Sequence, residues 1–367
     1  MREAVIKAGV ASDANYMGRL FGDIVNSADS SGEGVIPLCM TPYVSLVIHE
    51  AQAKPQTIDP SAFDSFTDDA REVCARARHS LKLFEDTRRG TDGQLRFFED
   101  EILKKHSSHF LGNTWLPPAR FLESDLSLFT YNETLISTSH AAAFHIGMRT
   151  ERLFHKDNEA YVRATMEKMG RCLYALGARL DAEGPRTFVR NLSREGVRHR
   201  DTRAAPYYQQ GFNGSTTPAI NGVLTDFQVR TNFIAFMLTA GSDVLDLEYT
   251  VFKIRYITLY QVLTSLMLLK ENAAYPLSRE STEILEGITG SEEARLITNS
   301  SARGFRNTLM HYNLPGRIDT QRITLDQPLF GLVSIFFPSH NYRSLSELTD
   351  RCVKTTAERL NSWADAT

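Results

Sequence analysis

The chain has 367 residues, of which 42% are hydrophobic and 23% are charged, and its formal net charge is −3 at pH 7. These values are ordinary for a globular protein, and the length suggests two domains. The small net charge excludes a globally basic nucleic-acid-binding protein, so any such site must be a local patch.

Targeting, membrane and metal signals are weak throughout the sequence. The N-terminus lacks the basic and apolar regions of a secretory signal, and no uninterrupted apolar run reaches the ~18 residues of a membrane span. Cys39, Cys74, Cys172 and Cys352 lie far apart and form no Cys-x-x-Cys pair. This argues against a zinc site or a disulfide framework and predicts a protein of the reducing cytoplasm that does not bind membranes.

The first half of the chain reads as helical. Apolar residues at spacings of three and four predict helices over 15–25, 61–85, 94–105 and 159–180, and a longer helical stretch from Pro117 to about Phe154. A short apolar segment occupies 44–48, and no segment alternates as a half-buried strand does. We therefore expect a helical N-terminal domain over residues 1–184, in which residues 1–60 have no recognisable role.

Residues 185–218 differ in composition, and we place the domain boundary here. Gly184-Pro185 breaks the preceding helix, and the segment contains many arginines against only Glu195 and Asp201. Its arginines are Arg186, Arg190, Arg194, Arg198, Arg200 and Arg203, and Tyr207 and Tyr208 follow them. We expect a basic linker between two domains.

Residues 219–367 predict a helical bundle. Helices are expected over 219–240 and 279–287, and a long helix over 246–272 is apolar almost all round, as a central buried helix is. Gly290-Ser291 is expected to cap a helix that ends near Pro315. The last helix begins with the capping box Ser344-Leu-Ser-Glu347. The predicted fold class is therefore all-α, with two mainly helical domains.

The helix that ends near Pro315 carries the best candidates for chemistry. Arg303, Asn307 and His311 are spaced i, i+4 and i+8 and should project from one face, with Arg306 on the flank. An arginine binds phosphate oxygens and stabilises charge on phosphorus, and a histidine transfers protons near neutral pH. Asn307 is suited to holding one imidazole tautomer. No acidic cluster accompanies the set, so we expect neither a metal nor another cofactor.

Arg306-Asn307-Thr-Leu-Met-His311 resembles the Arg-polar-x-x-x-His signature of the HEPN superfamily. The resemblance covers residues 219 to about 365, where the order of helices is also similar. It implies a metal-independent endoribonuclease of a toxin or antiviral-defence system, with Arg306 and His311 as catalytic residues and Asn307 orienting the site. It also implies a homodimer. The N-terminal domain would then sense a trigger, regulate the nuclease, or bind a protein inhibitor or defence-complex partner.

Other interpretations of the same residues stay open. Arg194 to His199 and Arg149 to His155 also have the Arg-to-His spacing, and the second match raises the alternative of tandem HEPN-like units. Arg306 and His311 also fit a helix C-terminus, where cations complement the dipole by ~0.3–1 kcal/mol. The histidine pairs at 106/109 and 140/145 lack ligand partners at suitable spacing and fit surface or core positions.

The basic segment has two interpretations. In the functional one, Arg194, Arg198 and Arg200 contact the RNA backbone together with Arg303, and Tyr207 and Tyr208 stack on bases. In the other, the segment is a solvated loop. The alternative function is correspondingly a non-catalytic HEPN-like RNA-binding or scaffold subunit of a larger complex.

Overall fold

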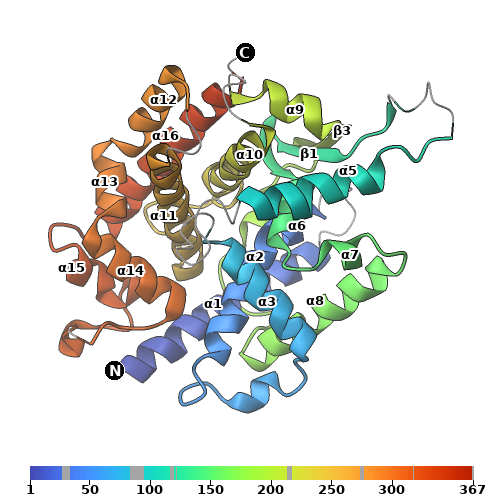
Figure 1. Ribbon diagram of the computed structural model, residues 1–367. Helices are drawn as coiled ribbons and strands as arrows, with labels where there is room; N and C mark the ends of the chain where they lie inside the picture. Colours follow the sequence, from blue (N-terminus) through green and yellow to red (C-terminus); the bar gives the residue numbers. More distant parts are fainter. Residues whose placement is uncertain are drawn as a thin grey trace.

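The computed structural model describes residues 1–26, 34–82, 95–115, 120, 122–212, 217–272, 277–316 and 318–365. These residues are mainly helical, as predicted, and also include a small β-sheet (Figure 1). The α-helices before residue 180 are α1 (Arg2–Asn26), α2 (Val35–Gln52), α3 (Asp68–Ser80), α5 (Lys104–Phe110), α6 (Ser139–His145), α7 (Thr150–Leu153) and α8 (Asn158–Ala175).

The later α-helices are α9 (Ala204–Gln210), α10 (Pro218–Asn232), α11 (Tyr249–Glu271), α12 (Arg279–Thr289), α13 (Glu292–Thr298), α14 (Ser300–His311), α15 (Leu332–Phe336) and α16 (Tyr342–Asp365). Short 3-10 or π-helical segments are η1 (Pro60–Phe63), η3 (Phe98–Leu103), η5 (Phe188–Asn191), η6 (Arg194–Gly196), η8 (Phe233–Met237), η9 (Thr320–Arg322) and η10 (Pro328–Gly331). None of the described helices has both the length and the apolar composition for crossing a bilayer.

The sheet corrects the all-α prediction. Among the described residues it has three antiparallel strands in the order β2 (Thr134–Thr138), β1 (Leu126–Tyr131), β3 (Val197–Thr202). Asn132 and Glu133 both have positive φ, 47° and 67°, in the two-residue turn between β1 and β2. This turn fits the twist of a hairpin. The long helical stretch predicted from Pro117 to about Phe154 is therefore wrong over strands β1 and β2, whereas α6 and α7 are helical as predicted. Residues 117–119 and 121 lie outside the described residues.

Two other predictions about element boundaries need correction. The segment 185–218 is not one loop, because its described residues form η5, η6, strand β3 and helix α9. Strand β3 is mostly exposed at the sheet edge, so its polar sequence shows no apolar alternation that would reveal it. The helix expected from Gly290-Ser291 is two helices, since Asn299 has extended backbone and caps α14 by accepting from the Ala302 amide at 2.8 Å.

Helix α11 occupies the centre of the fold, as its apolar composition predicts. It contacts α1, α10, α12, α13, α14 and α16 (Figure 1). The main hydrophobic cluster runs from Val5 in α1 to Trp363 in α16 and so contains residues from both sides of the predicted domain boundary. The two halves of the chain therefore share one core among the described residues.

Buried charges on α11 fix the helices around it. Lys253 is 3% exposed and pairs with the fully buried Asp13 of α1 at 2.6 Å. Thr250 Oγ1 donates to the same carboxylate at 2.7 Å, and the Tyr312 hydroxyl donates to it as well. Because a buried charge needs close partners, this network ties α1 and the end of α14 to α11.

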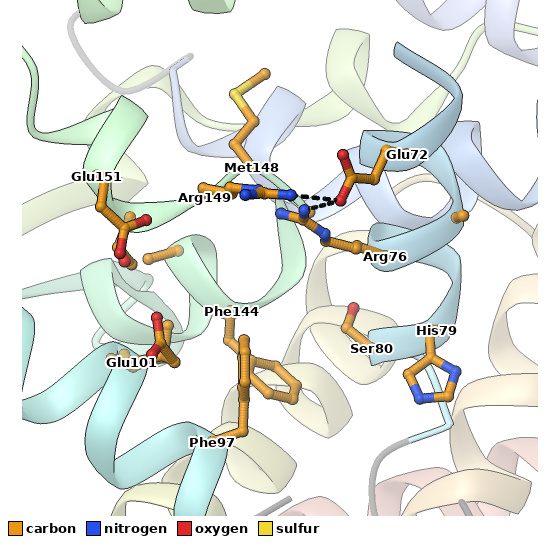
Figure 2. Close-up of a pocket in the computed structure, with 15 residues that line it drawn as sticks. Glu72, Arg76, His79, Ser80, Phe97, Glu101, Phe144, Met148, Arg149 and Glu151 are labelled. Carbon is orange, nitrogen blue, oxygen red and sulfur yellow. Dashed lines mark hydrogen bonds and ion pairs between the residues drawn. The ribbon is translucent and has the colours of Figure 1, made fainter. Parts of the chain in front are cut away.

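A cleft lies between α3, η3, α6 and α7. Its volume is about 720 Å³, and Phe97, Phe144 and Met148 supply apolar lining (Figure 2). Arg76 and Arg149 enter from opposite sides and both pair with Glu72. The cleft thus combines an apolar floor with a charged rim.

Substituting Asp13→Asn should destabilise the protein by about 3–5 kcal/mol, because Lys253 would stay buried without its counter-charge. Urea unfolding followed by circular dichroism measures the change. The matched variant Thr250→Val removes only a hydroxyl partner of Asp13 and should cost about 1 kcal/mol. Equal stabilities of Asp13→Asn and Thr250→Val would contradict this account of the network.

Candidate active site around His311

The site begins at the C-terminal end of α14, where Tyr312 fixes the backbone. Tyr312 has left-handed φ of 50°, which is strained for a residue other than glycine. Its ring lies 4.1 Å from Lys253 Nζ, and its hydroxyl donates to Asp13. The ring packs against Gly9 of α1, where a Cβ would lie 2.9 Å from the Tyr312 ring. These contacts hold Tyr312 and thereby position His311, the residue before it.

His311 joins Glu50 of α2 and Arg78 of α3. His311 Nδ1 lies 2.9 Å from Glu50 Oε2, and Arg78 reaches Glu50 Oε1 through Nε at 2.9 Å and Nη2 at 2.7 Å. Arg78 Nη2 is also 3.3 Å from His311 Nδ1. The side chains of Glu50, Arg78 and His311 are 6%, 14% and 29% exposed. Three helices therefore place an acid, a cation and an imidazole together, with the His311 ring the most exposed of the three.

The neighbours of His311 select its tautomer. Glu50 is an acceptor, so Nδ1 must carry the proton that it donates to the carboxylate. Nδ1–H cannot accept from Arg78, so Arg78 acts on the ring as a nearby positive charge. Nε2 is consequently the ring nitrogen that is left for proton transfer. A carboxylate that orients a histidine in this way is the arrangement found behind general bases.

Glu50 remains ionised although it is buried. Burial raises the pKa of its carboxyl, but the hydrogen bond from His311 and the charges of His311 and Arg78 outweigh this and bring the pKa to about 2. The pKa of the neighbouring His49 is lowered by burial and by the positive charge of Arg78. The site therefore keeps a fixed negative charge beside His311 at neutral pH.

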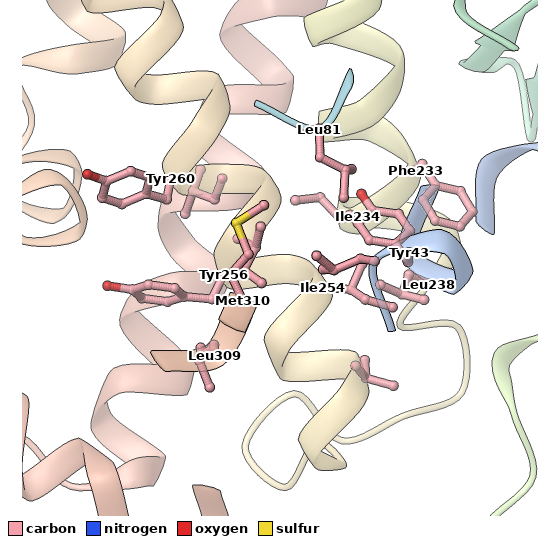
Figure 3. Packing of buried hydrophobic residues seen from close by; sticks show 14 of the residues in the cluster. Tyr43, Leu81, Phe233, Ile234, Leu238, Ile254, Tyr256, Tyr260, Leu309 and Met310 are labelled. Atoms are coloured by element: carbon pink, nitrogen blue, oxygen red, sulfur yellow. The ribbon is translucent and has the colours of Figure 1, made fainter. Parts of the chain in front are cut away.

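Arg306 is buried within the protein and is not positioned to contact a substrate. It is 5% exposed, its guanidinium lies 4.6 Å from the centre of the Tyr260 ring, and Nη1 donates to Asn307 Oδ1 at 2.8 Å. Its Nη1 is also 4.0 Å from Met310 Sδ. Tyr260 and Met310 lie within the packed side chains beside α11 (Figure 3). Asn307 thus contacts Arg306, and no hydrogen bond joins Asn307 to His311 within the described part of the chain.

The expected shared face of Arg303, Asn307 and His311 is the least buried face of α14. Arg303 is exposed, and Asn307 and His311 are half-buried. The intervening Phe305 and Leu309 are fully buried. The i, i+4, i+8 spacing therefore places these three residues on the same face, as predicted. It does not show that the His311 ring contacts α2 and α3.

The alternative Arg-to-His match at Arg149 and His155 does not assemble a site. Arg149 is 61% exposed and pairs with Glu72, whereas His155 is 54% exposed and lies 3.5 Å from Asp157. They flank α7, which has four residues. Arg149 and His155 therefore have different partners and do not contact each other's partner.

Of the residues of segment 185–218 that are predicted to contact RNA, some are exposed and others are not. Arg198 and Arg200 are exposed on β3, whereas Arg194 begins η6 and its side chain lies outside what the structure describes. Tyr207 is half-buried. The prediction that Tyr208 stacks on bases is wrong, because Tyr208 is 2% exposed, packs with Leu126 and Leu128, and bonds His140 Nδ1 at 3.0 Å.

Sequence reasoning missed Glu50 and Arg78, which complete the candidate site. Glu50 follows a long apolar run in a region without a recognisable motif, and Arg78 is one of several charged residues on an amphipathic helix. The one signal in the sequence was a Glu at the end of an apolar helical segment. Such a Glu is buried only when it has a partner, so it predicts an ion pair or a hydrogen bond. Its partner His311 lies in a distant part of the sequence and is not readable from spacing.

No group of three or more potential metal ligands occurs among the residues that the structure describes. Comparisons with protein-family models, curated proteins and solved structures find no significant match. The resemblance of 306–311 to the HEPN superfamily therefore stays a prediction.

Stability should fall at low pH as Glu50 is protonated. Its pKa is depressed in the folded protein, so its contribution is complete above the ordinary value of 4.5 and is lost as pH falls toward about 2. The shift corresponds to about 3 kcal/mol. Urea unfolding between pH 7 and pH 2 should show a steeper loss in wild type than in Glu50→Gln, and identical pH profiles would contradict the assignment.

Proposed function

We propose that the protein is an RNA endonuclease that needs no metal ion, with His311 as its acid–base residue. The observation that carries the proposal is the partly exposed His311 ring, which Glu50 holds through Nδ1 at 2.9 Å so that Nε2 is left for proton transfer. RNA supplies its own nucleophile, the 2′-hydroxyl, so the protein needs only to move protons and balance charge.

The proposed reaction is an internal transesterification. His311 Nε2 takes the proton of the 2′-hydroxyl while the 2′-oxygen bonds to phosphorus, and the bond from phosphorus to the 5′-oxygen breaks. The His311 imidazolium returns this proton to the leaving 5′-oxygen, which restores the neutral ring. The products are a 2′,3′-cyclic phosphate and a 5′-hydroxyl. Glu50 keeps Nδ1 protonated and stabilises the imidazolium that forms.

We assign the arginine at the phosphate to Arg78 instead of Arg306. Arg78 lies beside the His311 ring, whereas Arg306 is enclosed by Tyr260 and Met310. Arg303, which is exposed two turns before His311, is available for a neighbouring phosphate. The HEPN resemblance implied that Arg306 contacts the substrate. We propose instead that Arg306 supports the packing of α14. The homodimer, the protein inhibitor and the defence context stay predictions.

Substituting His311→Ala should lower cleavage of RNA by about 100-fold or more, because the acid–base group is lost. Cleavage is measured on a 5′-labelled single-stranded RNA in EDTA, and mass spectrometry identifies the cyclic-phosphate product. Arg78→Lys should also reduce the rate, whereas Arg306→Lys should act through stability. The matched control His155→Ala should cleave at the wild-type rate.

Wild-type protein that leaves RNA intact, or His311→Ala protein that cleaves at the wild-type rate, would contradict this proposal. Loss of cleavage in EDTA that Mg²⁺ restores would contradict the metal-free mechanism.

A second candidate function is RNA binding without cleavage, and the burial of Arg306 together with the exposure of Arg198 and Arg200 favours it. These two arginines are i and i+2 on β3 and so share one face of the strand. Arg198 pairs with the exposed Glu133 at 3.1 Å, an ion pair that salt weakens readily.

Neutralising Arg198 and Arg200 together should weaken RNA binding and make it less salt-dependent. Because two charges that pair with phosphates are then absent, the slope of log K against log salt should fall by about 1.4 for single-stranded RNA. Fluorescence anisotropy at several salt concentrations measures it. The control Arg163→Ala/Arg171→Ala removes two exposed charges from α8 and should keep the wild-type slope. Equal slopes for both double variants would count against the β3 contact.

A further inference from the structure

A second hydrogen-bonded group of side chains lies beneath the cleft of Figure 2. Ser80, the last residue of α3, has its Oγ 2.7 Å from His145 Nδ1. His145 Nε2 lies 2.9 Å from Oδ1 and 3.1 Å from Oδ2 of Asp226 on α10. The order hydroxyl, imidazole, carboxylate is that of a serine nucleophile, its general base and the acid that orients the base.

The hydrogen bond to Asp226 determines where the protons of Ser80 and His145 lie. Asp226 accepts, so Nε2 carries the ring proton and Nδ1 offers a lone pair to the Ser80 hydroxyl. Ser80 Oγ also lies 2.7 Å from the Ala77 carbonyl, so its proton has two acceptors. His145 is 5% exposed and Asp226 is 3% exposed, and of the three residues only Ser80 lines the cleft.

The groups that face His145 keep its imidazole neutral. Besides Ser80 and Asp226, Arg230 of α10 places Nη1 3.2–3.3 Å from the two ring nitrogens. Cys39 and Tyr43 of α2 line the small space on the other side. Burial lowers the pKa of His145, Asp226 raises it and Arg230 lowers it again, with a net decrease. The lowered pKa favours the neutral ring, which is the form that accepts a proton.

Ser80 opens into a cavity large enough for a small organic molecule. The cavity of about 720 Å³ is within the range of ligand sites, and Ser80 lies on its wall with Phe97 and Phe144 nearby (Figure 2). The two rings pack edge to face with centroids 5.9 Å apart and form an apolar floor. Arg76 precedes Ser80 by one helical turn, so both residues lie on the same side of α3.

We propose that Ser80, His145 and Asp226 form a second active site that hydrolyses small esters with an apolar acyl group. The acyl group would lie on Phe97 and Phe144, and Arg76 would face the oxygen that becomes negative. This site is separate from the His311 site. Arg78 of that site and Ser80 are two residues apart on α3, so they project from different sides of the helix.

The reaction proceeds in two balanced steps. Ser80 Oγ bonds to the ester carbonyl carbon as its proton passes to His145 Nδ1. The bond from that carbon to the alcohol oxygen then breaks, and the alcohol leaves with the proton from Nδ1. In the second step water bonds to the carbonyl carbon of the acyl–Ser80 ester as one water proton passes to His145 Nδ1. The bond from that carbon to Ser80 Oγ then breaks, and Oγ takes the proton from Nδ1. The products are the free carboxylic acid and the restored Ser80 hydroxyl. Asp226 touches neither reactant and is a positioning residue that holds the Nε2–H tautomer.

The test is covalent labelling of the intact protein with a short-chain alkyl fluorophosphonate. The Oγ–P bond should form on Ser80 with loss of fluoride and the hydroxyl proton, and tandem mass spectrometry of a digest locates the label. Hydrolysis of p-nitrophenyl butyrate by wild type should fall about 100-fold or more in Ser80→Ala. The exposed serine variant Ser108→Ala should retain the wild-type rate and labelling.

Asp226 is tested by the pH profile of labelling. In wild type the labelling rate should fall only at a lower pH than an ordinary histidine would give, because the pKa of His145 is lowered. In Asp226→Asn the plateau should fall about 10-fold or more, with a changed pH dependence that a loss of stability alone would not produce. Rescue in Asp226→Glu would support the role of the carboxylate.

Wild-type protein with no label on Ser80, or with its label on another residue, would overturn the proposal. Unchanged ester hydrolysis in Ser80→Ala would overturn it as well. Labelling is read on the wild-type protein, so it decides the question even where Ser80→Ala does not fold. None of these results depends on RNA cleavage, so the two proposals fail independently.

Discussion

The burial of α11 along most of its length is the constraint on which the rest of the structure depends. Charged side chains in the buried part of this helix must pair internally, and Lys253 and Arg255 do so with Asp13 of α1 and Asp350 of α16. Asp13 also binds the Tyr312 hydroxyl, so the same network determines where α14 ends. The position of His311 is therefore a consequence of how α11 is packed.

The two candidate sites share a physical origin in the pairing of buried groups across distant segments. Glu50 is shared by Arg78 and His311, and Asp226 holds His145, which in turn accepts from Ser80. Both carboxylates are nearly buried, where an unpaired charge is costly. In each group the carboxylate fixes one ring nitrogen of a histidine and leaves the other for proton transfer. Helix α3 contributes to both sites from different sides.

The sequence was sufficient for features that depend on local pattern. The long apolar run predicts α11, and the capping box with an apolar stripe predicts α16. The spacing of Arg303, Asn307 and His311 places them on one face of α14, which the structure shows to be its least buried face. It was insufficient for features that depend on pairing at long range. Strand β3 has no apolar alternation because it lies at an edge, and Glu50 and Asp226 find their histidines only in the folded chain. The contact of Arg306 with Tyr260 of α11 is likewise a long-range pairing that the sequence of α14 does not reveal.

The central claim is that His311 presents Nε2 to an RNA phosphodiester while Glu50 holds Nδ1–H. Proton–nitrogen correlation NMR of ¹⁵N-histidine-labelled protein tests it directly, with His311 assigned by comparison with His311→Ala. The neutral ring should show the Nδ1–H tautomer, and the Nε2 resonance should shift on titration with an RNA made uncleavable by a single 2′-deoxy substitution. An Nε2–H tautomer, or an Nε2 resonance that does not respond to saturating RNA, would contradict the account.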